Sequence, residues 1–119
     1  MKYALLICDD ETDPPSTEDL AADPVHQAWA DDLRRRDAFL VGVRLRPTET
    51  ASTVRVRADE TLVSDGPFVE TKDFVGGVVI IDVADLDEAV AVAAGHPYAR
   101  TGSVEIRPLW TWVPGPDDL

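Results

Sequence analysis

Apolar residues follow two different spacings along the chain, and each spacing predicts its own kind of element. Continuous apolar runs of strand length, and strict alternation of apolar and polar residues, are typical of β-strands. On this basis strands are predicted over residues 3–8, 39–46, 53–57, 61–63, 77–83 and 104–112. An apolar residue at every fourth position, as in Val25, Trp29 and Leu33, predicts a helix from the N-cap Asp23 to about Asp37.

The segment 85–95 carries the clearest helix signals. Asp85 and Glu88 form a capping box, Gly95 closes the helix, and Pro97 prevents its continuation. The face expected to be buried consists of Leu86, Ala89, Val90 and Ala93. A short helical turn is also predicted at residues 16–20, within the acidic loop that follows the first strand.

The order of these elements predicts an α+β fold. Strand–helix–strand, a hairpin, and strand–helix–strand form a ferredoxin-like arrangement (βαβ-hairpin-βαβ), an antiparallel sheet with two helices on one face. The hairpin pairs residues 53–57 with 61–63 through a turn at 58–60. The 119 residues suffice for one domain, expected at 1–113, and the tail at 114–119 is expected to fray.

Two strands of the predicted sheet, at residues 3–8 and 77–83, are apolar on both alternating faces. Two helices cover only one face of a four-stranded sheet, so the other face needs a cover. Burying one large apolar side chain is worth about 1.5–3 kcal/mol, and we therefore expect a homodimer packed face to face, joined by Trp110 and Trp112. The alternative is that the long insertion at residues 43–77 folds over this face.

The charge and the cysteine content limit the partners and the compartment. With 11 Lys and Arg against 23 Asp and Glu, the formal net charge is −12, which argues against nucleic acid as a partner. No apolar run is long enough for a membrane span, and the N-terminal run is too short and too quickly acidic for a signal peptide. The single cysteine, Cys8, excludes an internal disulfide. We expect a cytoplasmic protein without a membrane partner.

A glycine-rich stretch separates the hairpin from the most apolar strand. Gly66 allows backbone conformations closed to other residues, and Pro67 fixes its own φ, so the segment Asp65–Phe68 is expected to be a rigid bend. Further on, the missing side chains of Gly76 and Gly77 permit a bulge or the close approach of another backbone.

With these residues the chain resembles the DGPF-domain branch of the YCII-related family of small bacterial proteins. The matching segments, spread over roughly residues 2–109, are Asp65–Phe68, Glu70–Lys72, Gly76–Gly77, Asp85–Ala89 and Val104–Pro108. Asp73 departs from the pattern, because the family more often carries Glu there. The resemblance implies a ferredoxin-like fold that pairs into a dimeric α/β barrel, in a family whose biochemical activity is not settled.

The two histidines, His26 and His96, both fall at ends of predicted helices. Pro24-Val25-His26 resembles the Pro-x-His pattern of the wider family, whose His is assigned to an active site. The family pairs that His with the Asp of an Asp-Pro-Tyr segment. Here Gly95-His96-Pro97-Tyr98 resembles that segment, with His96 in the place of the Asp.

We hypothesise that His26 and Asp65 are catalytic. The positive end of the helix dipole disfavours a second proton on His26, and a neutral imidazole can act as a base. Asp65, held by the rigid bend, would orient His26 or act as the complementary acid. The structural alternative is that His26 caps the helix, Asp65 bonds its own turn, and His96 lies on the surface.

Three further residues are candidates for binding, namely His96, Arg107 and Phe68. Arg107 shares a strand face with Glu105, so it either binds a substrate carboxylate or forms a cross-strand ion pair. No metal site is expected, because His26, His96 and Asp65 lack a recognised ligand spacing. No cofactor is expected either, since no phosphate-cradling glycine motif is present.

The favoured function is therefore a small cytosolic dimer with a pocket between sheet and helices in each subunit. It would be an enzyme doing acid–base chemistry on a small organic molecule. The alternative is a non-catalytic ligand-binding or regulatory module, which the resemblance links to extracytoplasmic-function sigma factors.

Overall fold

The computed structural model describes residues 1–67, 73–113 and 115, so the tail expected at 114–119 lies outside the described residues except for Gly115. The strands are β1 (Lys2–Asp9), β2 (Phe39–Arg44), β3 (Ser52–Arg57), β4 (Glu60–Asp65), β5 (Phe74–Asp82) and β6 (Ser103–Pro108). The helices are α1 (Thr17–Ala22), α2 (Pro24–Arg35) and α3 (Leu86–Ala94), with 3₁₀ turns η1 (Thr48–Thr50) and η2 (Pro97–Ala99).

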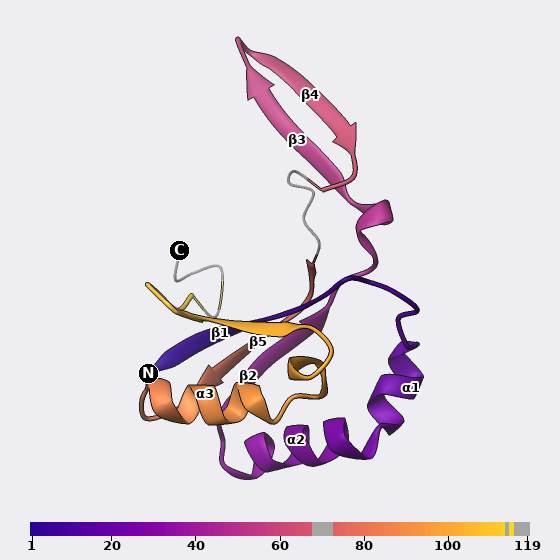
Figure 1. Cartoon of the computed structure of the whole chain (residues 1–119). Coiled ribbons are helices and arrows are strands. Elements are labelled where there is room, and N and C mark those ends of the chain that lie inside the picture. Colours follow the sequence, from indigo (N-terminus) through magenta and orange to yellow (C-terminus); the bar gives the residue numbers. More distant parts are fainter. Residues whose placement is uncertain (68–72, 114, 116–119) are drawn as a thin grey trace.

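Four of the strands form one antiparallel sheet in the order β2-β5-β1-β6. The three helices lie on one side of this sheet, and the other side is left open (Figure 1). The prediction of an α+β fold with an antiparallel sheet and helices on one face is thus confirmed.

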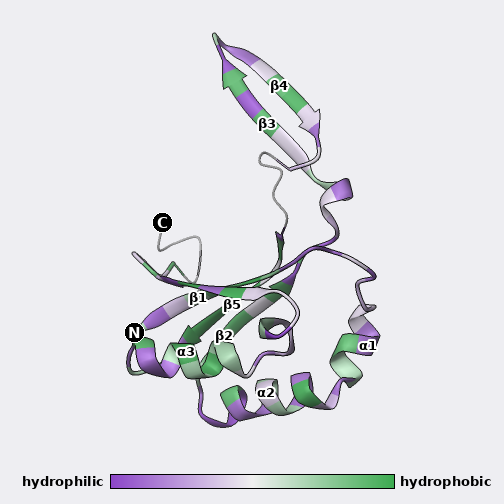
Figure 2. Cartoon of the chain, viewed as in Figure 1, coloured by the Kyte–Doolittle hydropathy of each residue, from purple (hydrophilic) through white to green (hydrophobic). Residues whose placement is uncertain are grey.

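The core lies between this sheet and the helices. Leu5 on β1 and Ile81 on β5 are fully buried, because alternate residues of these strands point toward α2 and α3. Hydrophobic residues accordingly follow the central strands (Figure 2). The remaining core residues include Tyr3, Ile7, Trp29, Ala30, Leu33, Val79, Val83, Ala89, Val92 and Ala93.

The helix ends follow the predicted caps. The Asp23 carboxylate accepts a hydrogen bond from the backbone N–H of Val25 at 2.8 Å, with Pro24 at the first helical position. At the start of α3, Asp85 accepts from the backbone N–H of Glu88 at 2.9 Å. The Glu88 carboxylate reaches back to the N–H of Ala84, one residue before the expected partner.

The predicted buried faces of the helices were partly wrong. Trp29 and Leu33 are buried, but Val25 is 56% exposed. On α3 the buried residues are Ala89, Val92 and Ala93, whereas Leu86 and Val90 are largely exposed. Contact with the sheet is thus made by small side chains, which let the α3 backbone lie close to the strands.

The last strand is shorter than predicted. β6 pairs with β1 from Ser103 to Pro108, and the N–H of Leu109 then closes the ladder on the carbonyl of Lys2 at 3.0 Å. Because β1 begins at Lys2, no partner strand is available beyond this point. Trp110 and Trp112 follow the end of β6 at Pro108 and so do not belong to the strand. Trp110 is wholly exposed and Trp112 is 39% exposed.

The paired glycines behave as expected. The register between β1 and β5 pairs Ile7 with Gly77 and Cys8 with Val75, so Gly76 is a bulged residue. A Cβ on Gly77 would lie 3.1 Å from the carbonyl oxygen of Val43, which is a close backbone approach. Gly66 has a φ of +92°, a conformation that glycine adopts without strain.

The hairpin is an arm of residues 52–65, β3 and β4, paired in a two-stranded sheet of its own. Its turn residues Ala58 and Asp59 both have positive φ, as a two-residue hairpin turn requires. The arm rises away from the helices, beyond the open side of the sheet (Figure 1). Val41 and Val43 on the open side remain 41% and 53% exposed, so the alternative that the insertion covers this face is wrong for the described part of the insertion.

Gly102 offers a direct test of the packing between β6 and β1. A Cβ at Gly102 would lie 2.0 Å from the carbonyl oxygen of Cys8, a backbone atom that cannot rotate away. We expect Gly102→Ala to lower the free energy of unfolding by about 1–3 kcal/mol or more, measured by urea denaturation. The control is Gly76→Ala, where a Cβ would meet only ordinary contact at 3.8 Å. Equal losses in the two variants would contradict this packing.

Candidate functional site

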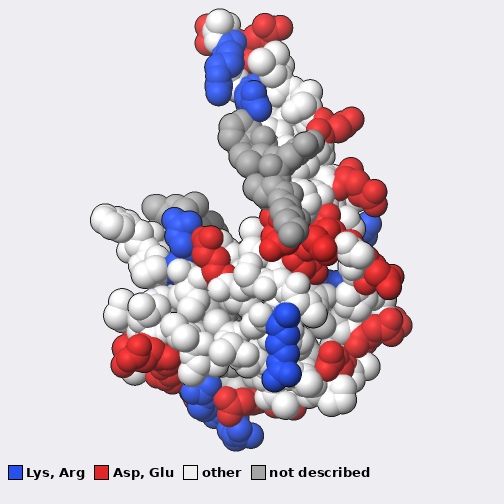
Figure 3. Space-filling model, in the orientation of Figure 1, with Lys and Arg blue, Asp and Glu red and all other residues white. Residues whose placement is uncertain are grey.

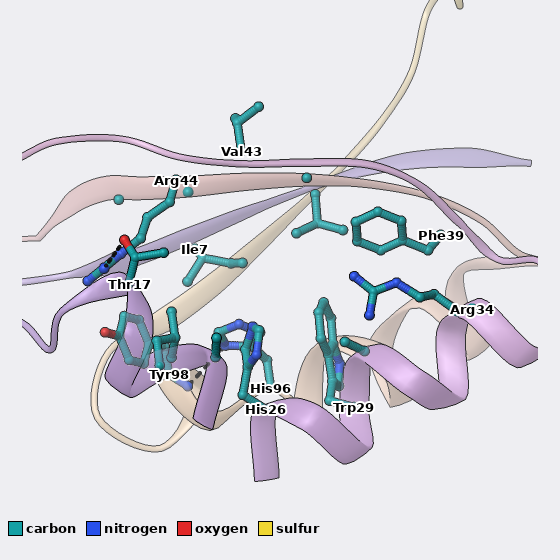
Figure 4. Close-up of a pocket in the computed structure, with 17 residues that line it drawn as sticks. Ile7, Thr17, His26, Trp29, Arg34, Phe39, Val43, Arg44, His96 and Tyr98 are labelled. Carbon is teal, nitrogen blue, oxygen red and sulfur yellow. Dashed lines mark hydrogen bonds between the residues drawn. The ribbon is translucent and has the colours of Figure 1, made fainter. Parts of the chain in front are cut away.

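A cavity of about 240 Å³ lies between the sheet and helices α1 and α2. Its apolar walls include Ile7, Trp29, Phe39 and Val79, and two histidines and two arginines also line it. The close-up shows these side chains arranged between the strands and α2 (Figure 4). The predicted pocket between sheet and helices is therefore present within a single copy of the chain.

His96 lies against this cavity and is 4% exposed. It caps η2, because its Nδ1 accepts a hydrogen bond from the backbone N–H of Tyr98 at 3.1 Å. The neutral ring must then carry its proton on Nε2. The expectation that His96 could be a surface residue is thus wrong, because the ring is buried against His26 and Trp29 of α2.

Three rings surround His96 edge to face. The ring centroid of Trp29 lies 4.8 Å from that of His96, Tyr98 lies at 5.6 Å, and His26 lies at 5.7 Å. Burial among these rings, with a smaller contribution from the charge of His26, lowers the pKa of His96 to about 4. His96 is therefore neutral at pH 7.

His26 is the third residue of α2 and is half-buried at the same cavity. Burial lowers the pKa of His26; the carboxylate of Asp23 opposes this shift and the charge of Arg34 adds to it. The direction is the one expected for a neutral base, and the largest cause is burial. Asp23 caps the helix, so the capping role considered for His26 is wrong.

Tyr98 also lines the cavity, and its hydroxyl points away from the two histidines (Figure 4). The hydroxyl is buried and has no hydrogen-bond partner of good geometry among the described residues. Burial raises the pKa of the Tyr98 phenol, and the nearby Arg44 guanidinium partly opposes that rise.

Arg34 and Arg44 bring positive charge to the cavity from two sides (Figure 4). The Cζ atom of Arg34 lies 5.2 Å from the centroid of the Phe39 ring, and Arg44 donates to the Thr17 hydroxyl at 3.0 Å and to the carbonyl of Pro15. The two hydrogen bonds hold the Arg44 guanidinium, whereas the Arg34 side chain is 61% exposed and lies 3.8 Å from the Asp31 carboxylate. The described residues that line the cavity include no carboxylate.

The structure does not place Asp65 with His26. Asp65 is exposed at the end of β4, pairs with Ser52 in the arm, and does not line the cavity. Arg107 is exposed and lies 3.3 Å from the carboxylate of Glu105, so it forms an ion pair, but within β6 and not across two strands as expected. Phe68 lies outside the described residues. Of the five predicted site residues, the structure thus brings together His26 and His96.

Sequence reasoning missed the part played by Trp29, Tyr98 and Arg44. Trp29 and Tyr98 stand close in the sequence to His26 and His96, and this proximity was a usable signal. No such signal pointed to Arg44, because the alternation of residues along a strand does not indicate which face of the strand borders a cavity. Within the described residues, no group of three His, Cys, Asp or Glu side chains is arranged to hold a metal ion. No helix among the described segments is long and apolar enough to cross a membrane.

Comparison with known proteins gives a family match over nearly the whole chain. The family model described as "YCII-related domain" matches residues 1–113. Uncharacterized protein R00369 of Rhizobium meliloti (strain 1021) is 50% identical over 74 residues, and the matched region spans 60% of this chain and 60% of that relative.

A solved structure also matches. It is the 5-chloro-2-hydroxyhydroquinone dehydrochlorinase of Burkholderia phenoliruptrix AC1100, in complex with 2,5-dihydroxybenzoquinone. The match covers 92% of this chain and 93% of that chain, with 16% sequence identity and a TM-score of 0.48.

The low pKa of His96 makes stability depend on pH in a defined direction. Between pH 6.5 and about 4 the unfolded chain binds a proton at His96 that the folded chain excludes. Neutral His96 therefore makes its full contribution to the free energy of unfolding above pH 6.5, and this contribution is lost as the pH falls toward 4. From pH 7 to 4.5 this loss amounts to roughly 2–3 kcal/mol.

His96→Asn tests this assignment, because an Asn side chain can still accept the N–H of Tyr98 but does not titrate. We expect the variant to lose less stability than the wild type between pH 7 and 4.5, measured by urea unfolding at both pH values. If both proteins lose the same amount, His96 is not held neutral by the fold.

Proposed function

The chain belongs to the YCII-related family, and from this premise we propose that it does acid–base chemistry on a small organic molecule bound in the cavity beneath its sheet. His26 is the base in this proposal. His96 donates a hydrogen bond from its Nε2–H to the ligand and keeps its proton, and Arg34 and Arg44 stabilise negative charge. The proton removed from the ligand goes to the His26 imidazole, and the ligand becomes its conjugate anion.

The observation that carries this proposal is that two histidines line one cavity with their rings close together. The rings of His26 and His96 lie 5.7 Å apart, and burial shifts both toward the neutral form. A base must be unprotonated at working pH and within reach of its substrate. His26 meets both conditions, because it is half-buried and lines the cavity.

The cavity favours a ligand of a particular chemistry. Its volume of about 240 Å³ lies below the range of roughly 300–1,000 Å³ that is usual for drug-sized ligands, so the ligand is small. The rings of Trp29, Phe39 and Tyr98 suit a flat apolar body. The two guanidinium groups suit an acidic substituent such as a carboxylate or an acidic hydroxyl.

The proposal includes a homodimer of ferredoxin-like subunits, arranged as a dimeric α/β barrel of the DGPF-domain branch. The strand order β2-β5-β1-β6 and the all-antiparallel pairing support the ferredoxin-like arrangement. The open side of the sheet carries apolar residues that the described part of the chain leaves partly exposed, which supports the dimer.

The same proposal includes a cytoplasmic location and the absence of a nucleic-acid partner. The net charge of −12 supports the absence of a nucleic-acid partner. Acidic side chains dominate the surface around α1, where a phosphate backbone would be repelled (Figure 3).

One observation favours the second candidate function, a non-catalytic ligand-binding or regulatory module linked to extracytoplasmic-function sigma factors. No described carboxylate lines the cavity, and Asp65 is exposed outside it, so His26 lacks the acidic partner that the sequence suggested. A binding module needs the cavity and its arginines but no proton relay.

Ligand binding is tested by thermal shift with a panel of small aromatic acids and phenols, with cyclohexanecarboxylate as the non-planar comparison. A ligand at 100 times its Kd stabilises the fold by about 2.7 kcal/mol, which raises the Tm by several degrees. We expect His26→Ala to remove most of this shift and Asp65→Asn to leave it unchanged. A shift that His26→Ala does not change would remove His26 from the site.

Turnover separates the two candidate functions. In D₂O a base that removes a carbon-bound ligand proton exchanges it for deuterium, which NMR of the ligand detects. We expect exchange catalysed by the wild type to fall about 10²-fold or more in His26→Ala. Ligands that bind without any exchange would favour the binding module.

A further inference from the structure

The arm of residues 52–65 is the least supported part of the fold. An isolated two-stranded hairpin is marginally stable in water at best, because it has no second layer on which to bury its side chains. The residues of β4 are all exposed, and those of β3 are exposed except Thr53. The radius of gyration is 16.1 Å, against about 13.5 Å for a compact chain of this length.

One face of the arm is apolar. The register pairs Val54 with Val63, and Val56 shares their face because side chains alternate along a strand. These three valines are here called the clasp face. Val54 is 62% exposed, Val56 57% and Val63 65%. An exposed apolar stripe of this kind is typical of an interaction surface.

The opposite face of the arm is suited to water. Arg55 and Leu62 form a pair there, and Arg57 pairs with Glu60 at the tip. Charged side chains gather at the tip in the space-filling view (Figure 3). The arm therefore has one apolar face and one polar face. This pattern is typical of a segment that binds a partner through its apolar face.

The root of the arm is fixed to the rest of the chain. The N–H of Gly66 donates to the carbonyl of Ala51 at 2.8 Å, and the Thr53 hydroxyl donates to the carbonyl of Gly66 at 2.8 Å. Below the root, the Glu11 carboxylate accepts from the N–H and the hydroxyl of Thr48 at 3.0 and 2.7 Å. These bonds set the direction in which the arm leaves the sheet.

The arm stands beside a second apolar surface. The open face consists of the residues of β1, β5 and β2 that point away from the helices, and Figure 4 shows Val43 pointing away from the cavity. The apolar members of the open face are Ala4, Leu6, Val41, Val43, Val78 and Ile80. The arm joins the sheet at the end where β1 finishes, and Figure 1 shows it rising on this open side.

We propose that the arm is a clasp for a second copy of this chain, with the clasp face of each copy packed against the other copy. The inference deepens the homodimer of the proposed function and rests on it. Two-fold symmetry lets each copy give one arm and receive one, while open face meets open face.

The area of the open face supports this role for the arm. Four strands about 4.8 Å apart with six residues of about 3.3 Å each form a face of roughly 19 by 20 Å. That is about 400 Å² in projection, and the side chains that stand on it expose a larger accessible area. An arm from each copy adds further exposed apolar surface to a contact whose standard size is about 800 Å² of accessible surface per partner.

The test compares two cross-strand pairs on opposite faces of the same arm. Val54→Ser/Val63→Ser removes most of the clasp face, and the matched control Arg55→Ser/Leu62→Ser changes the directly opposite pair. Sedimentation equilibrium measures the dimer Kd of each, with far-UV circular dichroism as a check on folding. We expect a dimer at micromolar concentration for the wild type, a Kd raised at least 10-fold by the first variant, and a change below 3-fold for the control.

Hydrogen exchange on the wild type gives a second readout that needs no variant. Amides of residues 52–65 should be protected at high protein concentration and lose that protection on dilution below the Kd. A wild type that stays monomeric at micromolar concentration overturns both the clasp and the homodimer. A dimer that responds equally to the two variants, or whose arm exchanges independently of concentration, overturns the clasp alone. The ligand-induced thermal shift should survive in the clasp variant, because the cavity lies within one copy.

Discussion

The arrangement of the site depends on one buried hydrogen bond, from the indole Nε1–H of Trp29 to the carbonyl of Val92, at 2.7 Å. It joins α2 to α3 within the core, and it satisfies the only polar atom of an otherwise apolar side chain. Gly95 leaves room for this contact, since a Cβ there would lie 3.3 Å from the Trp29 ring. The Trp29 ring also lines the cavity and contacts the His96 ring edge to face. Core packing and site geometry are therefore set by the same residue.

This constraint explains the electrostatics of the cavity. Trp29 and Tyr98 keep water from His96, and the cost of burying a positive charge there keeps the ring neutral. His26, one turn before Trp29 on α2, shares part of that burial. The site is a neutral histidine pair flanked by two guanidinium groups, a combination that accepts protons and tolerates the anion left behind.

Local signals in the sequence predicted the elements well, because caps and spacing act within a few residues. Asp23 and Asp85 marked the starts of α2 and α3, and Gly76 marked the bulge in β5. Tertiary contacts decided the rest. Which side of α3 is buried depends on how closely its small residues approach the sheet, and the burial of His96 depends on a ring 67 positions earlier in the chain, Trp29. Neither is encoded in a local pattern, and the same holds for Asp65, whose place in the arm follows from pairing with Ser52.

The central claim is that the fold holds both histidines neutral in one cavity, with the proton of His96 on Nε2. The most direct measurement is NMR of the ¹⁵N-labelled imidazoles as a function of pH, which reports the pKa and the tautomer of each ring. The account predicts that His96 stays neutral with Nε2 protonated down to about pH 4 and that His26 titrates below 6.5. A pKa of 6.5 or above for His96, or a ring protonated on Nδ1, would contradict it.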